Sequence, residues 1–369
     1  MSTRVAVVTG ATGLLGNNLV RALRARGWRV RAWARSAQKA EQQLGDTGAE
    51  VILGDLNDLT PLAPSLDGAD VVFHTAAYFR DNYKGGSHRA ELEKINVDGT
   101  RQLLEHAYSA GVRRFVHTSS IAVLQGSSQG LTDVTMRRRL EDADDYYRSK
   151  ILSEEVVREF LTNHTDFWAA FVLPGWMHGP GDLGPTSAGQ FVLDYMHRRL
   201  PGVLQTTFSV VDARDVAEAI VAAEARGLRG ESYLAAGKNC SMADLSNKLQ
   251  EISGVPHPKR SVPMSAVFLI AACNELYARL TRRPVLLSLA SARLMAREAN
   301  RTEFDHRDTE TKLGIRFRPI EETLRDELAW FRAHGLIAGE QASREESKRR
   351  EGETARRRQK DRPAPGWDR

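Results

Sequence analysis

The chain has 369 residues, 41% of them hydrophobic and 27% charged, and a formal net charge of +5. This length and composition are ordinary for a soluble globular protein with one large domain or two unequal ones. With only Cys240 and Cys273 and no secretory leader, the sequence argues against a disulfide framework or a cysteine metal site and indicates a reducing, cytoplasmic location.

The first predicted unit is an apolar run at 4–9, a glycine turn and a helical pattern at 14–26. The turn reads Thr9-Gly10-Ala11-Thr12-Gly13-Leu14-Leu15-Gly16. A strand that ends in such a turn presents free backbone N–H groups and the positive end of a helix dipole to an anion. The glycines also allow a pyrophosphate to approach the backbone. We therefore expect a dinucleotide site at Thr9, Gly10, Thr12, Gly13, Leu14, Leu15 and Gly16. The alternative is a structural turn without a ligand.

Strand and helix signals alternate through the first half of the chain. Further apolar runs lie at 28–34, 49–54, 69–76, 113–119 and 167–173, and helical patterns lie at 88–110 and 144–163. This rhythm predicts an α/β, Rossmann-type, doubly wound parallel sheet. Ligands of such sheets bind beyond the carboxyl ends of the strands.

The residues that follow these runs extend the predicted cofactor site. Arg35 comes after the second run, where an NAD-specific fold usually has an acidic residue. A guanidinium matches the 2′-phosphate of NADP(H), so NADP(H) is favoured as the cofactor, with NAD(H) as the alternative. The other interpretation is that Arg35 is an exposed side chain without a ligand. Asp55 and Leu56 are placed to meet the adenine, and Thr75, Ala76 and Ala77 leave room for phosphate and ribose. His74 is interpreted as a satisfied, partly buried histidine.

A candidate acid/base site follows the fifth run. Ser119 and Ser120 end that run, and Tyr146 and Lys150 lie four residues apart on one helix face. Tyr147 has no lysine four residues later, so the proton donor is assigned to Tyr146. A tyrosine with its ordinary pKa near 10 is a poor base, but a nearby ammonium favours its phenolate.

At this point the motifs resemble a known family, the extended short-chain dehydrogenases/reductases, also called the NAD(P)-dependent epimerase/dehydratase superfamily. The chain is most similar to the dihydroflavonol-reductase-like and 3β-hydroxysteroid-dehydrogenase-like branch. The matching motifs are TGATGLLG at 9–16, GDL at 54–56, INVDGT at 95–100, HTSS followed by YYRSK, and LPGWMHGPGD at 173–182. The closing segment at 313–335 also resembles the family, so the similarity covers about residues 3–336.

The resemblance implies a role for each candidate. Ser120, with Ser119 as the fallback, would bond the reacting oxygen; Tyr146 would be the acid/base and Lys150 would bind the nicotinamide ribose. Pro174 and Gly175 would border the nicotinamide. Asn96 matches an asparagine that ties a helix to the sheet and is interpreted as structural.

The substrate side is predicted to be a smaller lid. The Rossmann domain is expected at 1–174, rejoined by 207–235, and the lid at 175–206 and 236–336. Candidate pocket residues, each of which could equally be core, are Tyr78, Phe79, Tyr83, Trp176, Met177, His178 and Phe208. Their aromatic and apolar character favours a hydrophobic or ring-bearing substrate.

Two further segments carry predictions of their own. The apolar stretch 262–273 is too short to span a bilayer. The helix expected near 262–280 could roof the pocket, form a dimer face or touch a membrane, with core packing favoured. Residues 337–369 are expected to form a disordered charged tail. No nucleic-acid-binding module is recognisable, and a homodimer is a possible assembly.

The resulting hypothesis is an NADPH-dependent reductase, or reverse dehydrogenase, of a ketone or aldehyde, using Ser120, Tyr146 and Lys150. A second hypothesis is a nucleotide-sugar epimerase or dehydratase with bound NAD. Leu124 and Leu173 weaken it, because they replace a tyrosine and an arginine of many such relatives. The third is a non-catalytic NADP sensor, which would not need an acid/base.

Overall fold

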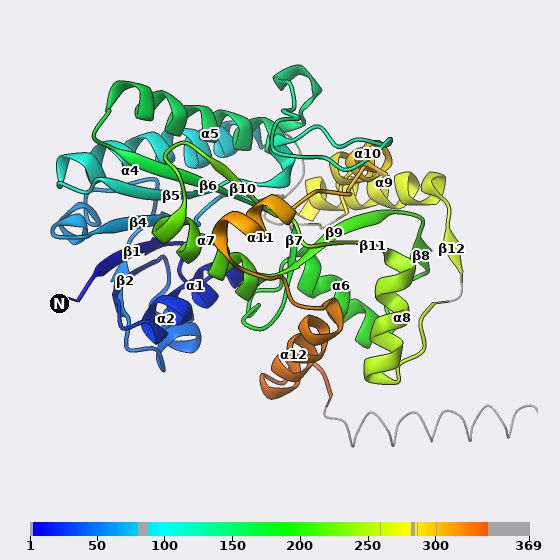
Figure 1. Ribbon diagram of the computed structural model, residues 1–369. Helices are drawn as coiled ribbons and strands as arrows, with labels where there is room; N and C mark the ends of the chain where they lie inside the picture. Colours follow the sequence, from blue (N-terminus) through cyan, green and yellow to red (C-terminus); the bar gives the residue numbers. More distant parts are fainter. Residues whose placement is uncertain are drawn as a thin grey trace, which may run out of the picture.

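Seven parallel strands form the central sheet in the order β10-β6-β5-β4-β1-β2-β3 (Figure 1). The structure is a computed structural model that describes residues 3–79, 88–258, 260–281, 285, 287–299 and 301–338. The strands are β1 (Val5–Thr9), β2 (Arg29–Ala34), β3 (Glu50–Leu53), β4 (Val71–His74), β5 (Arg114–Thr118), β6 (Trp168–Pro174) and β10 (Ser232–Ala235). The predicted Rossmann-type fold is confirmed, and all six apolar runs are strands of this sheet.

Helices cover both faces of the sheet, which explains why its central strands are apolar on both sides. On one face, Leu19, Val20 and Leu23 of one helix pack against Val216 and Ile220 of another. The helices of this face are α1 (Leu14–Ala25), α2 (Ala37–Leu44), α7 (Ala213–Arg226) and α11 (Arg307–Leu313). The opposite face is covered mainly by α4 (Gly99–Ser109) and α5 (Asp145–Asn163). Short α3 (Arg89–Leu92) and a π-helical turn at Glu93–Asp98 lead into α4.

A smaller unit lies beside the carboxyl ends of the strands. Its three-stranded sheet has the order β11-β9-β7, and a two-stranded sheet pairs β8 with β12. These strands are β7 (Trp176–His178), β8 (Val203–Leu204), β9 (Thr207–Asp212), β11 (Lys238–Ser241) and β12 (Ser261–Val262). The helices are α6 (Ser187–Met196), α8 (Met242–Ser253), α9 (Met264–Thr281), α10 (Leu289–Glu298) and α12 (Ile320–Ala333).

This arrangement changes one detail of the predicted division. The segment 207–235 does not return to the main sheet as a whole, because β9 pairs with β7 and β11 instead. Only α7 and β10 rejoin the Rossmann unit. Packing also continues past residue 336, since Ile337 is buried in the cluster formed by α6, α8 and α12. The rest of the predicted tail, from residue 339 on, lies outside the described residues.

Core packing accounts for only half of the apolar stretch near 262–280. Val267, Ala271 and Ala278 of α9 are buried, whereas Leu269 and Leu280 are 67% and 77% exposed. Within the described residues, no helix has the length and apolar character needed to cross a membrane.

Candidate active site

The glycine turn between β1 and α1 combines two glycines that the fold requires with one that it does not. Gly10 has φ +66°, and a Cβ there would lie 2.8 Å from the Cα of Ala76. A Cβ on Gly16 would lie 2.1 Å from the carbonyl oxygen of Gly10. Gly13 has an ordinary φ of −81°, and a Cβ there would meet only the Gly10 oxygen, at 3.4 Å.

Gly13 is also the N-cap of α1, and no side chain caps this helix. The first N–H groups of a helix have no partners within it, and their partial positive charge favours an anion. Leu14 and Leu15 point into the core, so only their backbone can face a ligand, while Thr12 is half-buried. The open space at Gly13 and the uncapped helix end therefore fit a phosphate group.

The neighbouring strand ends lie in sequence along the same edge of the sheet. Thr75 donates its hydroxyl to the Thr9 carbonyl (2.6 Å), and the Ala76 N–H donates to Thr9 Oγ1 (3.2 Å). These bonds fix the end of β4, including exposed Ala77, against the glycine turn. His74 is buried between Thr9 Oγ1 and Thr100 Oγ1 (2.8 and 3.0 Å), and burial lowers its pKa to about 3. It is therefore a neutral structural histidine.

On the other side of β1, the strand order places Arg35 and Asp55 at the ends of β2 and β3. Arg35 is exposed directly after β2. Asp55 accepts hydrogen bonds from the N–H and the side chain of Asn57 (2.9 and 2.8 Å), and Leu56 is half-buried against the core. The side chain of Asp55 thus shapes its own turn, while Arg35 is open to a ligand.

The two serines after β5 have different surroundings. Ser119 is buried, and its hydroxyl donates to Glu154 Oε2 at 2.7 Å. Ser120 is half-buried, and its Oγ accepts the N–H of Ala122 at 3.2 Å. The hydroxyl proton of Ser120 remains available in this arrangement, which favours Ser120 over Ser119 for contact with a substrate.

Tyr146 and Lys150 lie on α5, the helix that follows this serine in the chain. Tyr146 packs in one cluster with Ala122 and Leu92, and its ring meets Phe79 edge-on at 4.8 Å. Lys150 Nζ donates to the Thr118 carbonyl at 2.8 Å. Burial lowers the pKa of Lys150 to about 8, and the charge of Glu154 opposes this shift. Tyr146 and Lys150 thus contact Ala122 and Thr118, which lie two positions to either side of Ser120 in the chain.

Glu154 and Asn96 support this group, and the sequence analysis missed Glu154. Glu154 lies four residues after Lys150, and this spacing was the available signal. Asn96 Nδ2 donates to the Tyr78 carbonyl and to Ser149 Oγ, both at 3.0 Å, and its Oδ1 accepts the Tyr78 N–H at 2.7 Å. As predicted for a structural asparagine, it ties the segment after β4 to α5.

The predicted substrate residues differ in their burial and in what they pack against. Trp176 and Phe208 are half-buried and stack at 4.4 Å, while Met177 packs toward the Rossmann core.

Pro174 is buried, and a Cβ on Gly175 would lie 2.5 Å or less from the carbonyl oxygens of Ser209 and Ala236. Half-buried Tyr78 has its Oη 3.2 Å from His88 Nδ1. Tyr83 lies outside the described residues.

His178 corrects the predicted set. Its side chain is completely buried, and its Nδ1 lies 3.0 Å from Oε2 of Glu327, which is 1% exposed. A side chain without access to a cavity cannot touch a substrate, so His178 belongs to the packing between β7 and α12.

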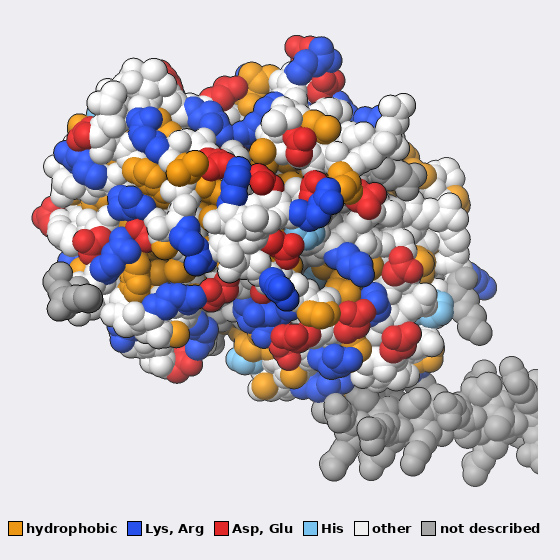
Figure 2. Space-filling view, in the orientation of Figure 1, with side chains coloured by type: hydrophobic (Ala, Val, Ile, Leu, Met, Phe, Trp, Pro, Cys, Tyr) orange, Lys and Arg blue, Asp and Glu red, His pale blue; other side chains and the backbone are white. Residues whose placement is uncertain are grey.

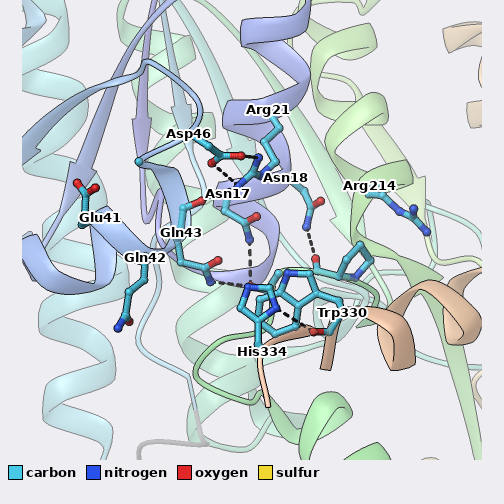
Figure 3. A pocket seen from close by; sticks show the side chains of 13 residues that line it. Asn17, Asn18, Arg21, Glu41, Gln42, Gln43, Asp46, Arg214, Trp330 and His334 are labelled. Atoms are coloured by element: carbon cyan, nitrogen blue, oxygen red, sulfur yellow. Dashed lines mark hydrogen bonds and ion pairs between the residues drawn. The ribbon is translucent and has the colours of Figure 1, made fainter. Parts of the chain in front are cut away.

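A cavity of about 630 Å³ lies away from this group, between α1, α2 and α12 (Figure 3). Asn17 and Gln43 both donate to the Gly181 carbonyl (3.1 and 2.7 Å), and Asn18 donates to the Pro180 carbonyl (2.9 Å). On the other wall, the rings of Trp330 and His334 stack at 3.8 Å. These amides attach the loop after β7 to α1 and α2, and none of the predicted catalytic residues lines the cavity.

Comparisons with known proteins identify relatives along most of the chain. The model of the NAD dependent epimerase/dehydratase family matches residues 6–236. Sterol demethylase protein B of Methylococcus capsulatus is 34% identical, over 90% of this chain and 99% of its own length. A provisionally named dihydroflavonol 4-reductase of Synechocystis sp. is 30% identical, over 89% of this chain and 95% of its own. The crystal structure of gox2253 superposes with a TM-score of 0.77 at 32% identity, covering 91% of this chain and all of that one.

Proposed function

Because the chain belongs to the NAD dependent epimerase/dehydratase family, we propose that it is an NADPH-dependent reductase acting on a ketone or aldehyde. The observation that carries the proposal is that Tyr146 packs with Ala122 and Lys150 bonds the Thr118 carbonyl, on either side of Ser120 in the chain. A binding protein without chemistry would not need a buried lysine next to a tyrosine and a serine.

The glycine turn supports a dinucleotide, and Arg35 supports the 2′-phosphate form. The backbone around Gly13 would hold the pyrophosphate, and the exposed guanidinium after β2 would pair with the extra phosphate. Thr75, Ala76 and Ala77 would lie along the cofactor, with Pro174 and Gly175 beside the nicotinamide. When bound, the cofactor supplies the hydride.

The side chains supply the proton and the orientation. Ser120 would donate a hydrogen bond to the carbonyl oxygen of the substrate, and Tyr146 would give that oxygen its proton. The Lys150 ammonium, held by the Thr118 carbonyl, stabilises the phenolate left behind. Because its pKa is about 8, this lysine is mostly charged near neutral pH.

A hydrophobic or ring-bearing substrate is favoured over a nucleotide sugar. Trp176 and Phe208 offer a stacked aromatic wall, with Tyr78 and Met177 as further candidates for contact. Leu124 and Leu173, which stand where many sugar epimerases have polar residues, are fully buried in the core. The relative named for a sterol reaction agrees with a ring-bearing substrate.

The first test concerns the cofactor. The dissociation constants of NADPH and NADH are measured for the wild type and for Arg35→Asp. We expect the wild type to prefer NADPH and the variant to bind it roughly ten- to a hundredfold more weakly, as loss of a charge-assisted contact requires.

Arg101→Asp, at an exposed position on α4, is the matched control and should leave both constants unchanged. A wild-type preference for NADH would contradict the NADPH assignment. NAD that stays bound through purification without exchanging would favour the nucleotide-sugar epimerase instead.

A further inference from the structure

The helix α9 presents an apolar face to solvent that the proposed reaction does not use. Its inner side is anchored, since Val267 and Ala271 are buried against Ala292 of α10. Its outer side carries Leu269, Ile270, Leu276, Tyr277 and Leu280, which are 67%, 38%, 61%, 47% and 77% exposed. These five residues are called the α9 stripe below.

The spacing of the α9 stripe places it along one side of the helix. Leu269, Leu276 and Leu280 are separated by seven and four residues, and Ile270 and Tyr277 by seven. Ten large hydrophobic side chains are exposed among the described residues, and half of them lie in this stripe. Single exposed leucines are ordinary, but a contiguous row of them marks an interaction surface.

The segment of the sequence that contains the stripe is strongly basic. The sequence from 256 to 301 holds eight Lys or Arg and only two acidic residues, so its net charge of +6 exceeds that of the whole chain. Both acidic residues are paired with arginine: Glu275 with Arg279 and Glu298 with Arg138, each at 3.0 Å. Acidic and basic side chains are interspersed over the face seen in Figure 2.

We propose that the α9 stripe docks onto an anionic lipid membrane, with the helix lying flat in the interface. Apolar side chains on one face of a helix, accompanied by Lys and Arg, are what such a surface binds. The inner face of α9 is held by the protein, so only the stripe can enter the lipid. A second copy of this chain fits less well, because it would bring two segments of charge +6 together.

The docking helix is connected to the candidate active site. At the end of α10, Glu298 pairs with buried Arg138, and Arg297 lies 3.2 Å from Asp142. The segment that carries Arg138 and Asp142 leads directly into α5, with Tyr146 in its first turn. Docking through α9 would therefore bring the substrate side of the site close to the bilayer.

The test uses the full chain and measures its cosedimentation with vesicles. Vesicles of phosphatidylcholine with phosphatidylglycerol are compared with vesicles of phosphatidylcholine alone. We expect the wild type to bind the anionic vesicles and to be released by salt. The triple variant L269Q/L276Q/L280Q should bind at least about tenfold more weakly.

The control is Leu228→Gln, because Leu228 is 66% exposed outside the stripe. It should bind vesicles like the wild type. Thermal unfolding and NADPH binding of the triple variant should be unchanged, which separates this proposal from the proposed function.

Three results would overturn the proposal. The first is a wild type that does not bind anionic vesicles. The second is a triple variant that binds as well as the wild type, which would assign the attraction to the basic C-terminal residues. The third is a wild-type dimer that the triple substitution converts to a monomer without any change in vesicle binding, which would identify a second copy as the occupant.

Discussion

Ser119 and Ser120 are adjacent in the chain but take part in different interactions. Ser119 belongs to a buried polar group around Glu154, which also accepts from Arg158 Nε at 3.0 Å. Ser120 instead accepts the N–H of Ala122, and Ala122 packs in the cluster that contains Tyr146. The sequence could nominate both serines, but it could not choose between them from spacing alone. The choice depends on the hydrogen bond between Ser119 and Glu154 of α5, which joins residues 35 positions apart in the chain.

Substitutions of Tyr146 and Tyr147 test the assignment of the proton donor. Tyr146→Phe keeps the ring and its packing but removes the proposed proton donor. Turnover should fall by about a hundredfold or more, while NADPH still binds. The measurement is steady-state reduction of a ring-bearing ketone, alongside cofactor titration.

Tyr147→Phe is the matched control. Tyr147 is half-buried, and its ring lies under the Arg138 guanidinium at 4.6 Å. Its loss should lower turnover only mildly. A large loss of turnover in Tyr147→Phe and a mild loss in Tyr146→Phe would show that the proton donor is Tyr147 and not Tyr146.

The helices and strands that the sequence predicted are those with a clear local pattern of apolar residues. The six apolar runs and the helices at 14–26 and 144–163 correspond closely to β1–β6, α1 and α5. The helix expected at 88–110 is divided into α3, a π-helical turn and α4. Helix α2 was missed, although Ser36 caps it by accepting the Lys39 N–H at 3.2 Å. The strands of the smaller sheet are short and pair across 28 residues or more, so no local period indicates them.

The turn between β1 and α1 offers a test with a built-in control. Gly13→Ala should leave the stability nearly unchanged, because its φ is ordinary and its Cβ would meet only the Gly10 oxygen at 3.4 Å. Binding of NADPH should weaken at least tenfold, because the methyl group would occupy the space proposed for the pyrophosphate.

Gly10→Ala, unlike Gly13→Ala, should lower the stability of the protein. Its φ of +66° costs roughly 1 kcal/mol for a residue with a Cβ. The contact with Ala76 adds to that cost, so the variant should unfold at a lower temperature even without cofactor. Equal loss of stability in both variants would show that Gly13 is needed by the fold rather than by a ligand.

At the scale of the whole molecule, the smaller unit contains a group of buried polar side chains from segments far apart in the chain. Asp182 is buried there, and its Oδ2 accepts from the Thr186 N–H and hydroxyl (2.8 and 2.9 Å). His178 and Glu327 form a buried pair in the same region. The sequence located His178 but assigned it to the substrate, because its partner Glu327 lies 149 residues away.

This buried polar group predicts a pH-dependent stability. Burial raises the pKa of Asp182 from 3.8 to about 6, and Glu327 adds to this shift. An acid whose pKa is raised on folding stabilises the fold fully below pH 3.8, and that contribution is lost as the pH rises through about 6. Asp182→Asn keeps an oxygen for Thr186 but cannot ionise. Its free energy of unfolding relative to the wild type should therefore increase by up to about 3 kcal/mol between pH about 4 and about 7.

Urea unfolding at several pH values measures this difference, and Asp67→Asn, at an exposed position, is the control. A relative stability of Asp182→Asn that does not change with pH would mean that Asp182 is solvated in solution.

The amides that join the two units have a further consequence. Asn17, Asn18 and Gln43 hold the carbonyls of Pro180 and Gly181 without any formal charge. Ions in solution screen charges, but they have little influence on buried neutral hydrogen bonds. Attachment of the lid to the nucleotide-binding unit should therefore persist at an ionic strength that detaches the protein from anionic lipid. Raising the salt concentration would release an intact enzyme from the surface, ready to bind again when the salt is diluted.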